Sequence, residues 1–168
     1  MKPFVLALMC LAVLSPEASI AQGNTAAPVV ELSAGHPGFV DDATIHNVAV
    51  GGSVRWHLSP RVSVGPELVY MRGPRSQRNV MATGNVTFDL LSPHAERRWI
   101  PFIVAGAGLF RHSDRFGAQG FSSNEGAFTV GAGVRAAITD CWFVGGEWRF
   151  GWELHSRLNG IVGVKLGS

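Results

Sequence analysis

The chain has 168 residues and a formal net charge of only +2, which argues against a polyanionic partner such as nucleic acid. No glycine motif opens a predicted helix, so a nucleotide-binding loop is excluded as well. Of the two cysteines, Cys10 lies near the N-terminus and only Cys141 lies in the body of the chain. Cys10 lies in the part of the chain that is predicted below to be cleaved, so Cys141 alone would remain, which excludes an intramolecular disulfide and a cysteine metal site.

The first residues have the layout of a secretory signal peptide. Lys2 precedes an apolar run from Phe4 to Leu14, and small residues at Ser19 and Ala21 stand before a predicted cut. The apolar run is too short for a transmembrane helix. We therefore expect Sec-dependent export and this organisation: a cleaved signal peptide over 1–21, a short linker over 22–27 and one domain over 28–168.

The rest of the chain is predicted to form short strands, because apolar and polar residues alternate with a period of two. Eight strands are expected, at about 28–35, 47–58, 62–71, 79–91, 99–111, 127–138, 141–152 and 159–167. Short connections (59–61, 92–98, 139–140) alternate with looser ones (36–46, 72–78, 112–126, 153–158). This pattern predicts an all-β fold, an eight-stranded antiparallel up-and-down barrel with tight turns at one end and loops at the other.

The two faces of these strands differ in charge. Apolar residues set the phase of each strand, for example Val48, Val50 and Trp56 in the second and Trp142, Val144 and Trp148 in the seventh. A water-soluble barrel has an apolar interior, so apolar residues outside and charges inside predict a transmembrane barrel surrounded by lipid. The charges predicted to face the interior are Glu31, Arg55, Glu67, Asp89, Arg111, Arg135, Glu147, Arg149 and Lys165.

Aromatic residues on the predicted outer face form two belts, as expected at the two membrane interfaces. The alternative is an ordinary aromatic core in a soluble sandwich, but it would leave the charges buried on the wrong face. The expected belts are Trp56, Phe88, Phe102 and Trp142 at the tight-turn end, and Tyr70, Phe110, Phe128 and Trp152 at the loop end.

Three segments, WIPFIVAGAGLF (99–110), AFTVGAGVRAAI (127–138) and CWFVGGEWRF (141–150), resemble the late strands of the small outer-membrane β-barrel superfamily. That group includes the OmpA transmembrane domain, OmpX-like proteins and the opacity proteins, and the resemblance covers nearly the whole of 22–168. It implies a bacterial outer-membrane location, insertion by the outer-membrane assembly machinery, contact with outer-membrane lipids and a monomer. One departure is the C-terminal VKLGS, where many members end in an aromatic residue that the assembly machinery reads.

A fold does not give a function, so the interior has to be considered by itself. Side chains largely fill an eight-stranded barrel, which argues against a diffusion porin. The predicted inward cations and anions nearly balance, and buried ions need partners. We therefore expect a structural salt-bridged interior in preference to an ion pathway, and a structural or surface-interaction role without catalysis.

A lipid hydrolase is the alternative function. The lipid A deacylase family resembles this chain in layout and carries a His-x-Ser-Asn motif after a strand ending like EWRF. Here His155 is followed directly by Ser156, and Ser123-Asn124 has no histidine two residues before it. Neighbouring residues on a strand point to opposite faces, so His155 and Ser156 are poorly placed for catalysis. The same argument counts against a catalytic triad formed by the run His112-Ser113-Asp114.

No cofactor or metal is predicted. His36, Asp41, Asp42 and His46 share the first loop and have suitable chemistry for a cation, but a solvated turn-forming loop is the favoured interpretation.

The second loop, RGPRSQR, contains Arg72, Arg75 and Arg78. Guanidinium groups pair well with phosphate, so a contact with the phosphates of lipopolysaccharide is one interpretation. Simple loop polarity is the other.

Overall fold

The computed structural model describes residues 27–41, 43–46, 48–73, 77–91, 98–116, 119–151 and 155–166. The predicted signal peptide and nearly all of the linker lie outside these ranges. In the described part of the chain, no helix has the length and apolar character needed to cross a membrane. The strands are β1 (Val29–Asp41), β2 (Ala43–His46), β3 (Val48–His57), β4 (Val62–Arg72), β5 (Arg78–Asp89), β6 (Trp99–Phe116), β7 (Gln119–Ala137), β8 (Trp142–Gly151) and β9 (His155–Lys165).

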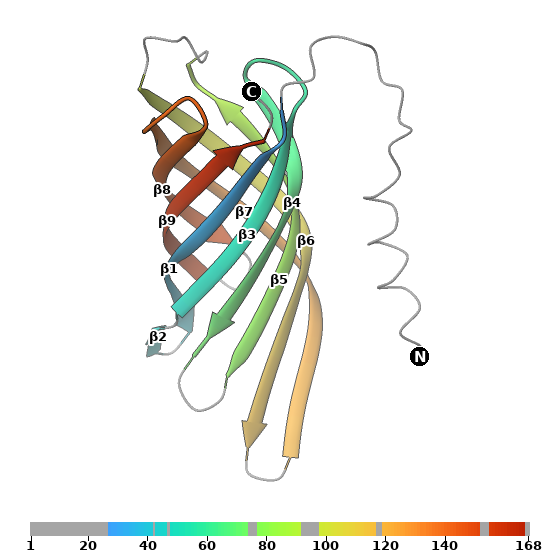
Figure 1. Ribbon diagram of the computed structural model, residues 1–168. Coiled ribbons are helices and arrows are strands. Elements are labelled where there is room, and N and C mark those ends of the chain that lie inside the picture. The colour runs from blue at the N-terminus through green and yellow to red at the C-terminus, as the bar shows by residue number, and fades with distance from the viewer. Residues whose placement is uncertain are drawn as a thin grey trace.

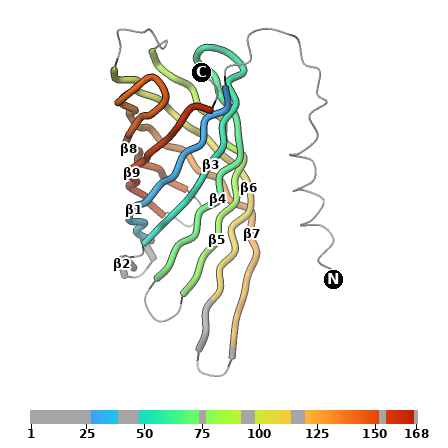
Figure 2. Tube along the Cα trace, in the orientation of Figure 1, coloured from blue at the N-terminus to red at the C-terminus, as the bar shows by residue number. Residues whose placement is uncertain are grey.

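The strands form one closed antiparallel sheet (Figures 1 and 2). From β3 to β9 each strand pairs with the next along the chain, and pairing of β1 with both β3 and β9 closes the barrel. The short β2 pairs only with the end of β1, so it is a hairpin extension of a barrel with eight strands. The predicted fold, an eight-stranded up-and-down β-barrel of the transmembrane type, is confirmed.

Two of the tight turns at one end of the barrel are built in the same way. The backbone N–H groups of Leu58 and Ser59 both donate to the carbonyl of Val62, at 2.9 and 3.2 Å. Ile138 and Thr139 do the same to Trp142, at 2.9 and 3.1 Å. In each turn a hydroxyl, Ser59 Oγ or Thr139 Oγ1, accepts the N–H of the first residue of the next strand. These local bonds explain why the turns are short.

At the other end, strands replace much of the predicted loops. The β6–β7 hairpin continues to the pair Phe116–Gln119, so most of the loop expected over 112–126 is paired strand. This hairpin projects beyond its neighbours (Figure 1). Likewise β1 and β2 pair within the loop expected over 36–46, and β9 begins at His155. Outside the apolar belt the two faces of a ribbon meet the same solvent, so the sequence shows no alternation there although the pairing continues.

The outer wall carries the apolar face. Leu32, Val50, Leu68 and Val130 are each more than half exposed, as expected for side chains whose solvent is lipid. The described belt residues that the sequence placed outside include Trp56, Phe88 and Trp142 at the turn end and Tyr70 and Phe128 at the loop end, and these are exposed. Trp152 lies outside the described residues.

Strand β6 has the opposite phase from the one predicted. Phe102 and Phe110 are 1% and 2% exposed and face the interior, whereas Ile103 and Leu109 are exposed. Both phases of β6 are apolar, so the alternation in the sequence was ambiguous, and the phase that placed Arg111 inside was wrong. The reason is steric. The Phe102 ring occupies the space beside Gly133, where a Cβ atom would come within 2.5 Å of the ring.

Candidate functional site

The interior contains two groups of charged side chains. The first, which we call the turn-side cluster, consists of Glu31, Arg55, Asp89 and Arg135 from β1, β3, β5 and β7. Arg55 binds Glu31 through two nitrogens, at 2.7 and 3.0 Å, and its third nitrogen donates to Ser63 Oγ at 2.9 Å. A bidentate guanidinium–carboxylate pair of this kind is strong and fixes the orientation of both groups.

Arg135 joins the opposite sides of the turn-side cluster. Its Nε donates to Glu31 Oε1 at 3.1 Å, and its Nη1 donates to Asp89 Oδ1 at 3.0 Å. The guanidinium carbon lies 3.7 Å from the centroid of the Phe102 ring, a cation–π contact. The inward phase of β6 therefore has an electrostatic consequence, since it places an aromatic face against a buried cation.

The second group, the loop-side cluster, consists of Glu67, Glu147, Arg149 and Arg157 from β4, β8 and β9. Arg149 lies 2.8 Å from Glu67 and 3.0 Å from Glu147. Neutral amides add to these pairs: Asn85 donates to Glu67 and Asn159 donates to Glu147, each at 2.9 Å. Each cluster thus contains two carboxylates and two guanidinium groups, so the charge balances locally.

Sequence reasoning missed Arg157, because the segment 153–158 was expected to be a loop. It is 0% exposed, donates to Glu67 at 2.9 Å and lies 3.9 Å from Glu147. Its Nε and Nη1 atoms have no hydrogen-bond partner in the described structure, so charge pairing rather than full hydrogen bonding holds it. Extending the predicted strand 159–167 by two residues toward the N-terminus would have placed Arg157 inside.

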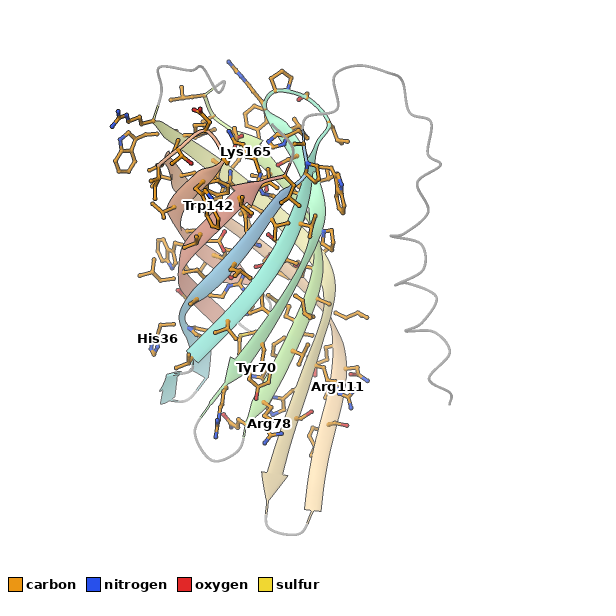
Figure 3. The ribbon with its side chains drawn as sticks, viewed as in Figure 1. His36, Tyr70, Arg78, Arg111, Trp142 and Lys165 are labelled. Atoms are coloured by element: carbon orange, nitrogen blue, oxygen red, sulfur yellow. The ribbon has the colours of Figure 1, made fainter. Side chains whose placement is uncertain are left out.

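Two predicted interior charges are not in these clusters. Arg111 is exposed on the outer wall, because β6 has the reverse phase. Lys165 is exposed at the turn end, where β9 finishes, and joins none of the ion pairs that the described residues form (Figure 3). The other seven predicted residues are all buried: Glu31, Arg55, Glu67, Asp89, Arg135, Glu147 and Arg149.

Apolar side chains fill the interior on the loop side of the charges. Met71, Met81 and Phe110, each at most 2% exposed, pack with Ala49, Val69 and Ala127. A second apolar group, Val29, Phe102, Val104, Phe143 and Ile161, packs around the turn-side cluster. Phe143 lies across Gly163 as Phe102 does across Gly133. The interior therefore contains both charged clusters and apolar groups of buried side chains.

Of the residues considered for hydrolysis, His112 and Ser123 are direct cross-strand partners on β6 and β7, whereas His155 and Ser156 lie on opposite faces of β9. His155 is buried in the interior, whereas Ser156 accepts a hydrogen bond from Trp148 Nε1 at 2.8 Å on the outer wall. His112 Nδ1 lies 2.8 Å from Asn79 Oδ1, and Ser123 donates to Glu125 at 2.7 Å. Neighbouring residues of a strand point to opposite faces, as the sequence argument assumed.

The candidate cation residues of the first loop are partly outside the described structure. His36 is exposed on β1 (Figure 3), Asp42 is not described, and nothing is described of the side chains of Asp41 and His46. Within the described ranges, no group of three or more His, Cys, Asp or Glu side chains is placed to hold a metal ion.

On the outer wall at the loop end, three arginines lie on adjacent strands. Arg72 on β4 and Arg78 on β5 are direct cross-strand partners, and both are exposed. Arg111 on β6 pairs with Val80, two residues from Arg78. Figure 3 shows Arg78, Arg111 and Tyr70 at this end of the barrel. Arg75 lies outside the described residues.

Comparison with known proteins supports the fold. No protein-family model and no curated protein matches the sequence. Among solved structures, Neisserial surface protein A is similar with a TM-score of 0.74 and 13% identity, over 86% of this chain and 100% of that one. The N-terminal β-barrel domain of Pseudomonas aeruginosa OprF has a TM-score of 0.60 and 16% identity, over 82% and 97%. The attachment invasion locus protein Ail of Yersinia pestis, in complex with the heparin analogue sucrose octasulfate, has a TM-score of 0.51 and 11% identity, over 84% and 96%.

These similarities confirm the resemblance predicted from the strand motifs. The chain has the fold of the small outer-membrane β-barrels.

Proposed function

We propose that this protein is an outer-membrane barrel with a structural or surface-interaction role, a permanently filled interior and no catalytic activity. The observation that carries the proposal is the pairing of eight buried charges in two locally neutral clusters. Charges paired at these distances hold strands together, and an eight-stranded interior has little room beyond its side chains. Any interaction with other molecules then involves the outer wall and the loop end of the barrel, and not the interior.

The membrane location has three supports. The outer wall is apolar over its middle, and a closed barrel satisfies its backbone hydrogen bonds within itself, as a lipid solvent requires. The N-terminal residues have the pattern of an export signal. The similar structures include Neisserial surface protein A and the attachment invasion locus protein of Yersinia pestis. We place the long β6–β7 hairpin outside the cell and the tight turns in the periplasm.

Conductance of the refolded full chain in planar lipid bilayers tests the filled interior. A heat-modifiability gel first shows that the sample is folded, since a folded barrel migrates differently before and after boiling. We expect no steady single-channel currents above the lipid background. Regular channel openings from folded wild-type protein would contradict the proposal.

A different measurement distinguishes the non-catalytic role from a lipid hydrolase. Mass spectrometry of lipid A from cells with and without the protein should show the same acyl chains. Loss of one acyl chain in the presence of the wild-type protein, and its retention with His155→Ala, would establish catalysis and refute the non-catalytic role.

A further inference from the structure

The three outer-wall arginines lie on adjacent strands near the loop end of the barrel, and Arg111 is in register with Val80, two residues nearer the barrel middle than the Arg72–Arg78 pair. Exposed Leu68 and Tyr70 on β4 establish that even-numbered residues there face outward, which includes Arg72. Val80 and Val86 show the same for Arg78 on β5, and Ile103 and Leu109 show it for the odd-numbered Arg111 on β6. Direct cross-strand partners have Cβ atoms roughly 5 Å apart and diagonal neighbours roughly 7 Å. The three guanidinium groups can therefore reach one small ligand.

No carboxylate neutralises these arginines in the described structure. Arg72 has Val48 and Arg78 as cross-strand neighbours, Arg78 has Arg72 and Ser113, and Arg111 has Val80 and Asn124. The nearby Glu125 lies beside Ser123 on the other phase of β7. Like charges directly opposite each other on a sheet are destabilising. The arrangement thus places three positive charges together with no carboxylate partner among the described residues.

An anion with several oxygen acceptors suits this arrangement. Planar guanidinium groups bind phosphate through paired hydrogen bonds, which lysine cannot do. All three positively charged residues of this group are arginines. The Tyr70 side chain lies two residues along β4 on the same face.

The position of the arginines selects a lipid-borne anion over a dissolved one. Immediately toward the barrel middle, the same strands expose Tyr70, Val80 and Leu109, at 38%, 37% and 64%, and Leu68, 58% exposed, follows Tyr70 on β4. Two residues along a strand span roughly 7 Å. A phosphate held by the arginines would therefore stand directly above the start of the apolar wall, where acyl chains pack.

We propose that Arg72, Arg78 and Arg111 form one binding site for the phosphate group of an outer-leaflet lipid, with the lipid's acyl chains against Leu68, Val80 and Leu109. The proposal rests on the outer-membrane placement proposed above, and it adds Arg111 to the loop arginines that the sequence suggested. It is independent of whether the barrel conducts.

Native mass spectrometry of the full chain in an uncharged, phosphate-free detergent tests the site. The probes are bisphosphorylated lipid A and the same lipid after removal of both phosphates, with inorganic phosphate as competitor. We expect the phosphorylated lipid to bind more tightly, and Arg72→Gln, Arg78→Gln and Arg111→Gln each to weaken it roughly tenfold, the loss expected for a charge-assisted hydrogen bond. Arg98→Gln, an exposed arginine at the turn end, is the matched control and should leave binding unchanged.

The outcomes separate the alternatives. Equal binding of both lipids, binding of neither, or equal weakening by Arg98→Gln overturns the site. Displacement by inorganic phosphate at a concentration equal to that of the lipid overturns the lipid source. If Arg111→Gln binds the phosphorylated lipid as tightly as the wild-type protein does, any phosphate contact is limited to Arg72 and Arg78 beside the loop. That result also overturns the proposal. If Arg111→Gln does not fold, Arg111→Lys keeps the charge and should show intermediate binding. Conductance is measured separately, so failure here leaves the filled interior untouched.

Discussion

Arginine is used in opposite ways on the two walls of this barrel. On the inner wall Arg55, Arg135 and Arg149 are buried and lie 2.7 to 3.1 Å from carboxylates. On the outer wall Arg72 and Arg78 are exposed, stand opposite each other and have no acidic neighbour in the described sheet. Burial requires pairing, because an unpaired ion loses its hydration with nothing in return. An unpaired cluster persists only at the surface, where an external anion can supply the missing charge.

Arg135→Leu should have the largest effect, because it leaves Asp89 without its ion pair. Removing one partner of a buried pair costs about 3–5 kcal/mol. Urea unfolding of the refolded barrel in lipid vesicles measures the loss. Adding Asp89→Asn should restore part of it, whereas adding Glu147→Gln should not, because Glu147 pairs with Arg149 and Arg157 instead. Equal rescue by both would show that the clusters act as one pool of charge.

Ile103→Arg and Val134→Arg come next and test the lipid-facing wall. A guanidinium against hydrocarbon near the bilayer midplane costs about 2–4 kcal/mol. The two substitutions should cost similar amounts, because both positions lie on the outer phase of their strands. The same urea series checks this. A penalty at Val134 but none at Ile103 would return β6 to the phase that the sequence suggested.

Arg111→Gln should change stability little, by less than about 0.5 kcal/mol, as for other exposed positions. The substitution is expected to weaken lipid binding and not the fold. Stability is therefore measured on the barrel in detergent without phosphorylated lipid. A loss of several kcal/mol under those conditions would mean that Arg111 has a structural partner like those of the interior arginines.

Tag insertions should leave the fold intact and test only the direction of the barrel. A tag beside Gly120, at the tip of the β6–β7 hairpin, should be labelled on intact cells, and one beside Ala95 should not. The expected difference follows from hairpin length, since long connections face outside in barrels of this type. Reversed labelling would move the arginine site to the periplasmic leaflet.

The sequence alone determined which face of most strands is apolar. In β8 the large outward side chains and the inward Glu147 and Arg149 occupy separate phases, so the period of two has one solution. β6 has apolar residues on both phases, and only its contacts decided the outcome: Phe102 fits beside Gly133 and beneath Arg135. Those contacts are long-range and leave no periodic signal.

Strand ends and ion-pair partners were likewise decided by the tertiary structure. Arg157 is in the interior because β9 pairs with β1 as far as His155, although its segment reads as a loop. Arg135 and Glu31 are 104 residues apart and meet only because the barrel closes between β1 and β9. The grouping of Arg111 with Arg72 and Arg78 also depends on the register of β5 with β6. Alternation along one strand specifies a face, but which side chains meet across a barrel depends on closure and stagger.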